Sequence, residues 1–273
     1  MKELTLEEIK KVLIGLLEEF DEICRKEGLK YSLCGGSAIG AVRHKGFIPW
    51  DDDIDIAMLR EDYNKFIEYC KTHKTTFKPC FHEINNNYYL MFGKVYDPNT
   101  KYVQDKVVSG DQAGVAIDIF PIDYLTKDYE TSLKLYKKSK FLRNLLLAKN
   151  WKKFIKGKSG NFILETGRWM FFMLSRCFNG KKIIDRIERL YINNEKENAE
   201  FIMSVGGAYM EKEIMNKNIY DEFMDIEFEG KNYMIINKYD EYLKQLFGDY
   251  MKLPPKEKQK SHHEYPAYWA KNK

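Results

Sequence analysis

Two carboxylates, Asp53 and Asp55, lie one residue apart in the strand-like run Asp53–Met58. Successive side chains of a strand point to opposite faces, so both aspartates share one face and Ile54 lies on the other. Like charges on one face repel each other, which destabilises a strand that has no other use for them. Carboxylate oxygens are the ligands that Mg²⁺ or Mn²⁺ prefers, so the pair predicts a metal site.

A glycine-rich turn, Gly35-Gly36-Ser37, lies upstream between an apolar strand at 30–34 and a short helix at 37–44. Glycine lets the backbone approach a phosphate closely, and the N-terminus of a helix offers free N–H donors. We therefore expect Gly35, Gly36 and Ser37 to hold phosphate oxygens of a nucleotide.

A third carboxylate, Asp118, lies in the strand-like run Val115–Phe120, on the face of the small Ala116. A two-metal site needs such a carboxylate from a neighbouring strand, and we expect Asp118 to complete the metal shell. The alternative is that Asp118 caps the chain or pairs with a lysine. Asp51 lies two residues before Asp53 and shares its face if the strand begins early. It is then a further ligand, a general base or neither. Asp52 is expected in a solvated loop.

Two cations and an aromatic side chain lie between the turn and the acidic strand. Arg43 and Lys45 can neutralise a diphosphate, although an exposed basic turn explains Lys45 at least as well. Trp50 is either a stacking platform for the nucleotide or a lid on the core.

The two motifs together, Gly-Gly-Ser and then Trp-Asp-Asp-Asp-Ile-Asp-Ile at 50–56, resemble the signature of the LicD family, which includes the fukutin-related proteins. The resemblance runs from about Leu29 to His263. It implies a nucleotidyltransferase fold of the DNA polymerase β-like type, with the metal on Asp53, Asp55 and Asp118. It also implies metal-dependent transfer of a substituted phosphoryl group.

In the best-known members of that family, phosphocholine passes from CDP-choline to a sugar hydroxyl of a cell-surface glycan. The resemblance therefore implies a CDP-linked donor and a glycan or lipid-linked glycan acceptor, of the teichoic acid, lipopolysaccharide or capsule type. The rival enzymatic interpretation is nucleotidyl transfer, in which the nucleotide stays on the acceptor and pyrophosphate leaves. Both interpretations use the same acidic face.

The C-terminal tail resembles the family's Pro-Pro-containing tail with a histidine. His262 or His263 is a candidate substrate contact, and Lys258 and Lys260 stand where the family often carries an arginine. Upstream, Cys70, His73, Cys80 and His82 lack the spacing of paired zinc ligands, so zinc is disfavoured. Several tail aromatics, Tyr265 among them, suit a cage for a quaternary ammonium.

The composition indicates a soluble globular protein, with 273 residues, 44% hydrophobic and 32% charged. We see no signal peptide and no uncharged stretch of the roughly 20 residues that span a membrane. The five cysteines are scattered, which is typical of reduced thiols in the cytoplasm. We expect a cytoplasmic enzyme, and the sequence gives no indication of its oligomeric state.

Basic residues concentrate between Lys134 and Lys182, where fourteen Lys/Arg face one acidic residue, so the rest of the chain is net −9. Interleaved with Phe and Trp, this basic block resembles helices that lie on a membrane surface, and we expect peripheral contact with the inner leaflet. A solvated helical insertion explains it nearly as well. A non-catalytic nucleic-acid-binding module is the third interpretation, but the block contains no base-reading motif, so we expect no nucleic acid.

The predicted fold class is α/β (α+β), a mixed sheet with flanking helices and with the acidic groups at one edge. Residues 1–125 are expected to form the nucleotidyltransferase-like core. Residues 126–273 supply helices, returning strands and the tail of the same unit. Predicted elements include a helix capped by Thr5 and Glu8 and ended by Gly28, and single strands at 88–96, 115–120 and 219–229.

Overall fold

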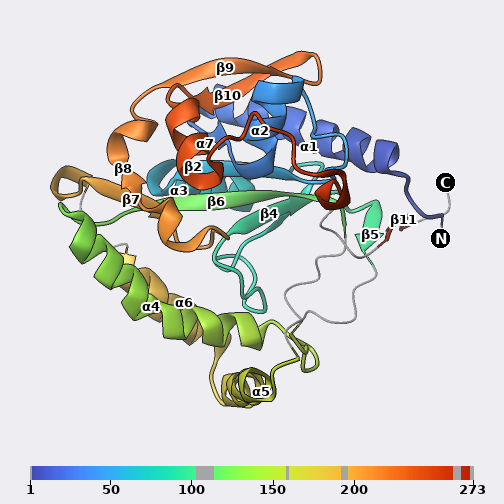
Figure 1. Cartoon of the computed structure of the whole chain (residues 1–273). Coiled ribbons are helices and arrows are strands. Elements are labelled where there is room, and N and C mark those ends of the chain that lie inside the picture. Colours follow the sequence, from blue (N-terminus) through green and yellow to red (C-terminus); the bar gives the residue numbers. More distant parts are fainter. Residues whose placement is uncertain (1, 103–113, 158–159, 192–195, 261–265, 271–273) are drawn as a thin grey trace.

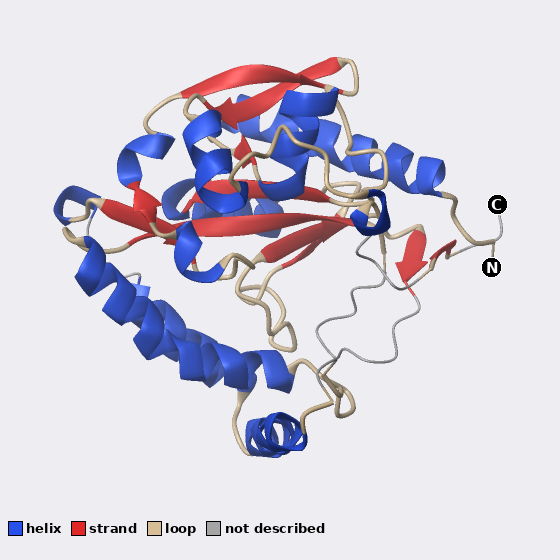
Figure 2. Cartoon of the chain, viewed as in Figure 1, coloured by secondary structure: helices blue, strands red, loops and turns tan. Residues whose placement is uncertain are grey.

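Among the described residues, a seven-stranded mixed sheet forms the centre of the protein (Figures 1 and 2). The structure is a computed structural model that describes residues 2–102, 114–157, 160–191, 196–260 and 266–270. The strands of the sheet are β1 (Ser32–Leu33), β2 (Ile54–Leu59), β3 (Lys78–Cys80), β4 (Gly93–Tyr96), β6 (Ala116–Tyr124), β7 (Phe201–Ser204) and β8 (Met215–Asn216). Their order is β1-β2-β6-β4-β3, with β7 paired to β6 and β8 to β7. Only the central pair β2–β6 is parallel within this sheet.

Helices cover both sides of the sheet, which confirms the predicted fold class. They are α1 (Leu6–Glu27), α2 (Gly35–His44), α3 (Arg60–Thr72), α4 (Tyr129–Lys149), α5 (Phe162–Arg176), α6 (Gly180–Tyr191) and α7 (Tyr239–Phe247). In Figure 1, α1, α2 and α7 lie above the sheet, whereas α4 and α6 lie below it with α5 beyond them. Short 3₁₀ turns are η1 (Lys196–Asn198), η2 (Met210–Glu213), η3 (Lys217–Tyr220) and η4 (Lys256–Lys258). Two small antiparallel pairs, β9 (Phe223–Phe228) with β10 (Lys231–Ile236) and β5 (Thr100–Tyr102) with β11 (Ala267–Trp269), complete the described elements.

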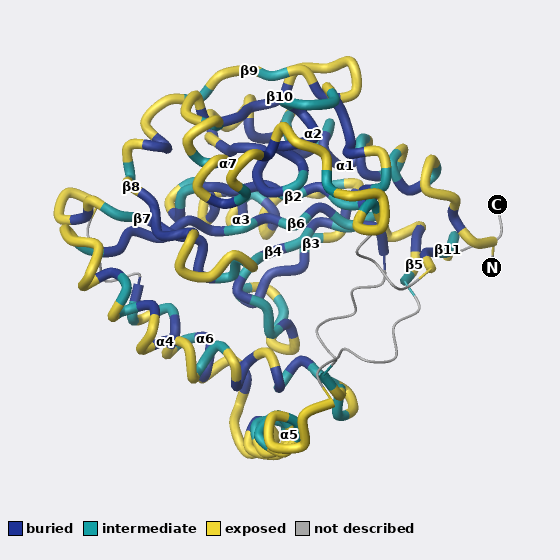
Figure 3. Tube along the Cα trace, viewed as in Figure 1, coloured by how far each residue is buried: buried dark blue, intermediate teal, exposed yellow. Residues whose placement is uncertain are grey.

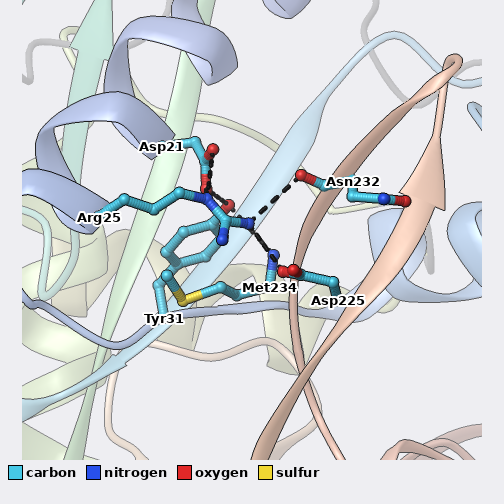
Figure 4. A network of polar contacts seen from close by, with 6 residues as sticks. All are labelled: Asp21, Arg25, Tyr31, Asp225, Asn232 and Met234. Carbon is cyan, nitrogen blue, oxygen red and sulfur yellow. Dashed lines mark hydrogen bonds and ion pairs between the residues drawn. The ribbon is translucent and has the colours of Figure 1, made fainter.

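Helix α1 begins and ends where its sequence predicts. The Thr5 hydroxyl accepts the Glu8 N–H, the Glu8 carboxylate accepts the Thr5 N–H, and Gly28 ends the helix with a left-handed φ of 67°. A polar network then joins α1 to the β9–β10 hairpin (Figure 4). Arg25 donates to Asp21 on its own helix and to Asp225 on β9, at 2.7–2.9 Å. This network fixes the hairpin on the side of the sheet where α2 lies.

Three predicted elements differ in the structure. Helix α2 starts at Gly35, so the glycines form its first turn rather than a separate turn before it. The strand predicted at 88–96 begins only at Gly93. The strand predicted at 219–229 is instead η3 and the first half of a hairpin, because Glu229 and Gly230 turn the chain with φ of 50° and 79°.

Strand β6 continues through Pro121, where the sequence predicts its end. Its antiparallel neighbour on one side changes from β4, which ends opposite Ile119, to β7, which begins opposite Ile122. Pro121 lies between the part of β6 that pairs with β4 and the part that pairs with β7. Its missing N–H therefore removes no hydrogen bond to either of these strands. The strand order places β2 and β6 in the interior of the sheet, so the acidic groups lie at the centre of the sheet and not at its edge.

The buried side chains form two clusters. The larger contains the strands, α1, α2, α3 and α7, and the smaller packs α4 and α6 against β7. Helix α5 contributes little to either, and its outer surface is exposed along its length (Figure 3). Within the described parts of the chain, no helix has the length and apolar character that crossing a membrane requires.

Candidate active site

The parallel pairing of β2 with β6 brings two of the predicted carboxylates side by side. Asp55 is opposite Asp118 in the register, and Asp53 lies just before the start of β2. The antiparallel β4 places Lys94 opposite Asp118 on the other side. The Lys94 ammonium lies 2.6 and 3.0 Å from the two Asp118 oxygens, so the lysine partner considered for Asp118 exists.

The two glycines in the first turn of α2, Gly35 and Gly36, are closely approached by carboxylates. A Cβ at Gly35 would lie 3.0 Å from an Asp55 oxygen, and a Cβ at Gly36 would lie 2.9 Å from an Asp51 oxygen. Gly35 also has a left-handed φ of 54°, which a side chain would disfavour. The glycines therefore allow the first turn of α2 to pack against the acidic cluster.

Burial and mutual repulsion make these carboxylates hard to ionise together. Burial, then the charges of Asp53 and Asp118, raise the pKa of Asp55 well above its ordinary value, although Lys94 opposes this. Burial, then the charges of Asp53 and Asp52, raise the pKa of Asp51 to about 7. A cation bound among these groups would relieve the repulsion.

The carboxylates fit the predicted cation in donor chemistry, because they offer oxygen ligands only and carry excess negative charge. Lys94 supplies part of the compensating charge at Asp118 and would share that carboxylate with a bound ion. His82, Glu83 and Glu188 form a separate group of potential metal ligands. One ligand atom from each of these three described residues lies within 4.8 Å of the other two. The side chain of Arg60 lies 3.6 Å from Glu188, so a cation already faces that group.

A cleft of about 390 Å³ opens beside the acidic cluster. Its lining contains seven residues named as candidates from the sequence: Gly36, Arg43, Trp50, Asp51, Asp53, Asp55 and Lys258. The chain beyond α7 closes the other side and supplies two further cations, Lys252 and Lys258. The cleft thus sets carboxylates against cations, an arrangement suited to a metal and a diphosphate.

Arg43 points into this cleft from the last turn of α2. Its guanidinium donates to the Tyr250 carbonyl at 2.6 Å and to His44 at 2.9 Å, which fixes its position on the cleft wall. Trp50 is half-buried against the larger cluster and lines the cleft as well, so its two interpretations both stay open.

Other predicted residues lie elsewhere. The Ser37 hydroxyl is buried and accepts the Asp55 N–H at 2.9 Å, so it fixes the acidic strand to α2. Lys45 forms an exposed ion pair with Glu227 of β9, at 2.9 Å, and is not part of the cleft lining. Asp52 is buried and not solvated, which corrects that expectation. His262 and His263 are outside the described residues.

Two residues at the site, Lys94 and Tyr209, were not predicted from the sequence. Lys94 reaches the site through the β4–β6 pairing, and Tyr209 reaches it from the segment before η2. Neither residue carries a local signal, because each depends on contacts between segments distant in the sequence. A lysine opposite the third carboxylate becomes predictable only once strand order and register are known.

Comparisons with known proteins give the following similarities. Residues 28–156 match a family model described as LicD/FKTN/FKRP, nucleotidyltransferase domain. The chain is 34% identical over 276 residues to the lipopolysaccharide cholinephosphotransferase LicD of Haemophilus influenzae, over 98% of this chain and 99% of that protein. It is 40% identical over 57 residues to the human ribitol 5-phosphate transferase FKRP, over 21% of this chain and 10% of that protein. An uncharacterized protein of Rickettsia typhi is 29% identical over 133 residues, over 47% of this chain and 39% of that protein.

Proposed function

Because this chain belongs to the LicD family, a family of phosphotransferases, we propose that it transfers phosphocholine from CDP-choline to a hydroxyl of a cell-surface glycan. The observation that carries the proposal is the similarity to a lipopolysaccharide cholinephosphotransferase over nearly the full length of both chains. The acceptor is a lipid-linked or envelope glycan of the teichoic acid, lipopolysaccharide or capsule type. The resemblance seen in the motifs at 35–37 and 50–56 is confirmed at the level of the family.

Asp53, Asp55 and Asp118 would hold Mg²⁺ or Mn²⁺. When bound, the ion would polarise phosphate oxygens and stabilise the charge that develops on them. The excess of carboxylates over cations in this part of the site supports that role, as does the raised pKa of Asp55. Ser37 keeps the strand that carries Asp55 in place through its hydrogen bond to the backbone.

The cationic side of the cleft would bind the diphosphate of the donor. Arg43 is held rigidly by the Tyr250 carbonyl, and Lys252 and Lys258 line the same cleft. The N–H groups in the first turn of α2, next to Gly36, add donors for phosphate oxygens. Trp50 would contact the base or the ribose from the cleft wall.

Asp51 would act as the general base, since its pKa of about 7 suits proton transfer near neutral pH. The acceptor hydroxyl gives its proton to Asp51 and forms a bond to the phosphorus that bears choline. The bond from that phosphorus to the bridging oxygen breaks, and CMP leaves with the electron pair. In the rival reaction the acceptor hydroxyl attacks the α-phosphorus of a nucleoside triphosphate. The nucleotide is then transferred to the acceptor, and pyrophosphate leaves with the electron pair of the broken bond.

We further propose that the protein works in the cytoplasm, at the inner leaflet of the membrane. Helix α5 supports this, because it exposes Phe162, Ile163 and Met170 by 83%, 79% and 61%. The surrounding basic block carries fourteen Lys/Arg against one acidic residue. Apolar side chains framed by cations suit an anionic lipid surface.

Product analysis tests the reaction. The purified protein is incubated with CDP-choline, a lipid-linked glycan acceptor and Mg²⁺, and the released nucleotide is identified by chromatography. We expect CMP, in an amount equal to the phosphocholine on the acceptor, and none after chelation. Pyrophosphate from CTP, with cytidylate on the acceptor, would establish the rival reaction instead.

A further inference from the structure

A second, smaller cavity of about 100 Å³ lies next to the cleft. Asp55 and Tyr209 line both, so the two spaces share a wall at the acidic cluster. Six apolar side chains from β2, β6, β7 and β8, all Ala, Ile, Met or Phe, form one part of the remaining wall. A ligand whose phosphate lies beside Asp55 therefore has an adjoining apolar space for a small substituent.

Besides Asp55 at the shared wall, a second carboxylate, that of Glu213, lies among these apolar side chains. Glu213 is only 9% exposed, and one of its oxygens accepts the Tyr209 N–H at 2.8 Å. No described Lys, Arg or His nitrogen lies within 4.0 Å of it to form an ion pair, and the charge of Arg143 acts on it only from a greater distance. A Cβ at Gly207 would lie 2.0 Å from either Glu213 oxygen, so the chain keeps a glycine where the carboxylate packs. A buried carboxylate of this kind is stabilised by a cation.

Three tyrosines, Tyr209, Tyr220 and Tyr242, line the same cavity. Tyr242 is held in place because its hydroxyl accepts the Gly35 N–H at 3.1 Å, which joins the cavity to the first turn of α2. The charge of Glu213 acts on all three phenols, where it adds to burial in raising their pKa. Aromatic rings around one carboxylate form the surroundings that attract an organic cation through its diffuse charge.

We propose that this cavity, the Glu213 cavity, binds the quaternary ammonium group of the donor, and that it selects choline over neutral substituents. A trimethylammonium group has no N–H, so it needs no hydrogen-bond acceptor and suits a largely apolar wall that contains aromatic rings and the carboxylate of Glu213. A polyol of similar size carries no charge, so it would gain neither the attraction of the rings nor that of the carboxylate, which disfavours it relative to choline. The inference rests on the proposed function for the identity of the donor, but the cavity's preference for a cation follows from its own residues.

Binding measurements on Glu213→Gln test the proposal. Calorimetry with CDP-choline and with CMP, which lacks the head group, separates the head-group contribution from that of the nucleotide. We expect Glu213→Gln to weaken CDP-choline roughly tenfold and to leave CMP unchanged, because only the cation contacts this cavity. Glu211→Gln, an exposed glutamate in the same turn η2, is the matched control and should bind both like the wild type.

A competition on the unaltered protein covers the case in which Glu213→Gln does not fold. Tetramethylammonium should displace CDP-choline and leave CMP bound, and failure to do so would overturn the proposal. If the enzyme transfers phosphocholine but Glu213→Gln binds CDP-choline like the wild type, this inference is wrong and the proposed function stands. If tetramethylammonium binds through Glu213 but no choline donor is turned over, the cavity stands and the proposed function fails.

Discussion

The cleft buries charged side chains, whereas helix α5 exposes apolar ones, so each region differs in the opposite way from the usual distribution of side chains in a folded protein. Around the cleft, Asp51, Asp55 and Glu213 place carboxylates in the interior, next to the larger hydrophobic cluster. On α5, large apolar side chains stay on the surface beside many cations. Each departure destabilises an isolated folded chain, so each supports a proposal made above: a metal and the cationic head group of the donor beside the carboxylates, and a lipid surface at α5.

The two regions also differ in how firmly they are held. The cleft is built on β2, β6 and α2, all within the larger cluster, and Ser37 hydrogen-bonds the strand to the helix. The helices below the sheet depend on the smaller cluster and on polar contacts such as the one between Arg60 and Glu188 of α6. A rigid site and a more weakly attached docking region suit an enzyme that must meet its acceptor at a surface.

The largest expected loss of stability is that of Arg60→Met, which breaks a buried ion pair between α3 and β6 that also faces Glu188 of α6. Arg60 and Asp123 are buried and form two hydrogen bonds of 2.6 and 2.8 Å, so the change leaves Asp123 charged and unpaired. We expect urea unfolding to show a loss of about 3–5 kcal/mol. Arg25→Met, which removes comparable but exposed ion pairs, should cost less than about 1 kcal/mol. Equal losses in the two variants would show that the buried network adds nothing.

The double variant Ile163→Ser, Met170→Ser tests the surface of α5. Both side chains are exposed and lie seven residues apart on the helix, so the change should leave the free energy of unfolding nearly unaltered. Partition onto anionic vesicles should fall at least about tenfold, because a buried apolar side chain contributes about 1.5–3 kcal/mol. Met224→Ser, on β9, is the control. Equal binding to anionic and neutral vesicles across a salt series, or binding to neither, would contradict the proposed contact with the inner leaflet.

A pH series on the metal-free protein tests the buried charge. The folded state keeps the Asp51 proton up to about pH 7, whereas the unfolded state loses it near 3.8, so stability should fall as pH rises between these values. Asp51→Asn should remove up to about 1.4 kcal/mol per pH unit from that slope. Parallel pH profiles for wild type and variant would mean that Asp51 ionises as freely when folded as when unfolded.

Sequence alone predicted the features that depend on neighbouring residues. The Thr5–Glu8 cap, the helix end at Gly28 and the shared face of Asp53 and Asp55 are local patterns, and the cap and the helix end are confirmed. The Glu229-Gly230 turn was missed because glutamate seldom adopts a positive φ, so the hairpin carried no usual signal.

The rest of the site depends on tertiary pairing. Lys94 reaches the acidic cluster from β4, and Tyr209 and Glu213 reach it together from the segment around η2. Nothing in their local sequence distinguishes these residues from surface residues. The continuation of β6 through Pro121 was also not predictable from local sequence. A proline is tolerated there because β4 ends and β7 begins on either side of it. Local patterns thus predict the candidate metal ligands, whereas Lys94 and the Glu213 cavity can be recognised only once the pairing of the strands is known.

The most direct test of the central claim is Mn²⁺ binding followed by electron paramagnetic resonance. The wild type should bind the ion, and Asp53→Asn and Asp55→Asn should each weaken binding by at least about 10–100-fold and abolish CMP release. Glu68→Gln, which alters an exposed carboxylate on α3, should bind Mn²⁺ and release CMP like the wild type. Wild-type affinity for Mn²⁺ in both aspartate variants would contradict the assignment of the metal to the acidic strand.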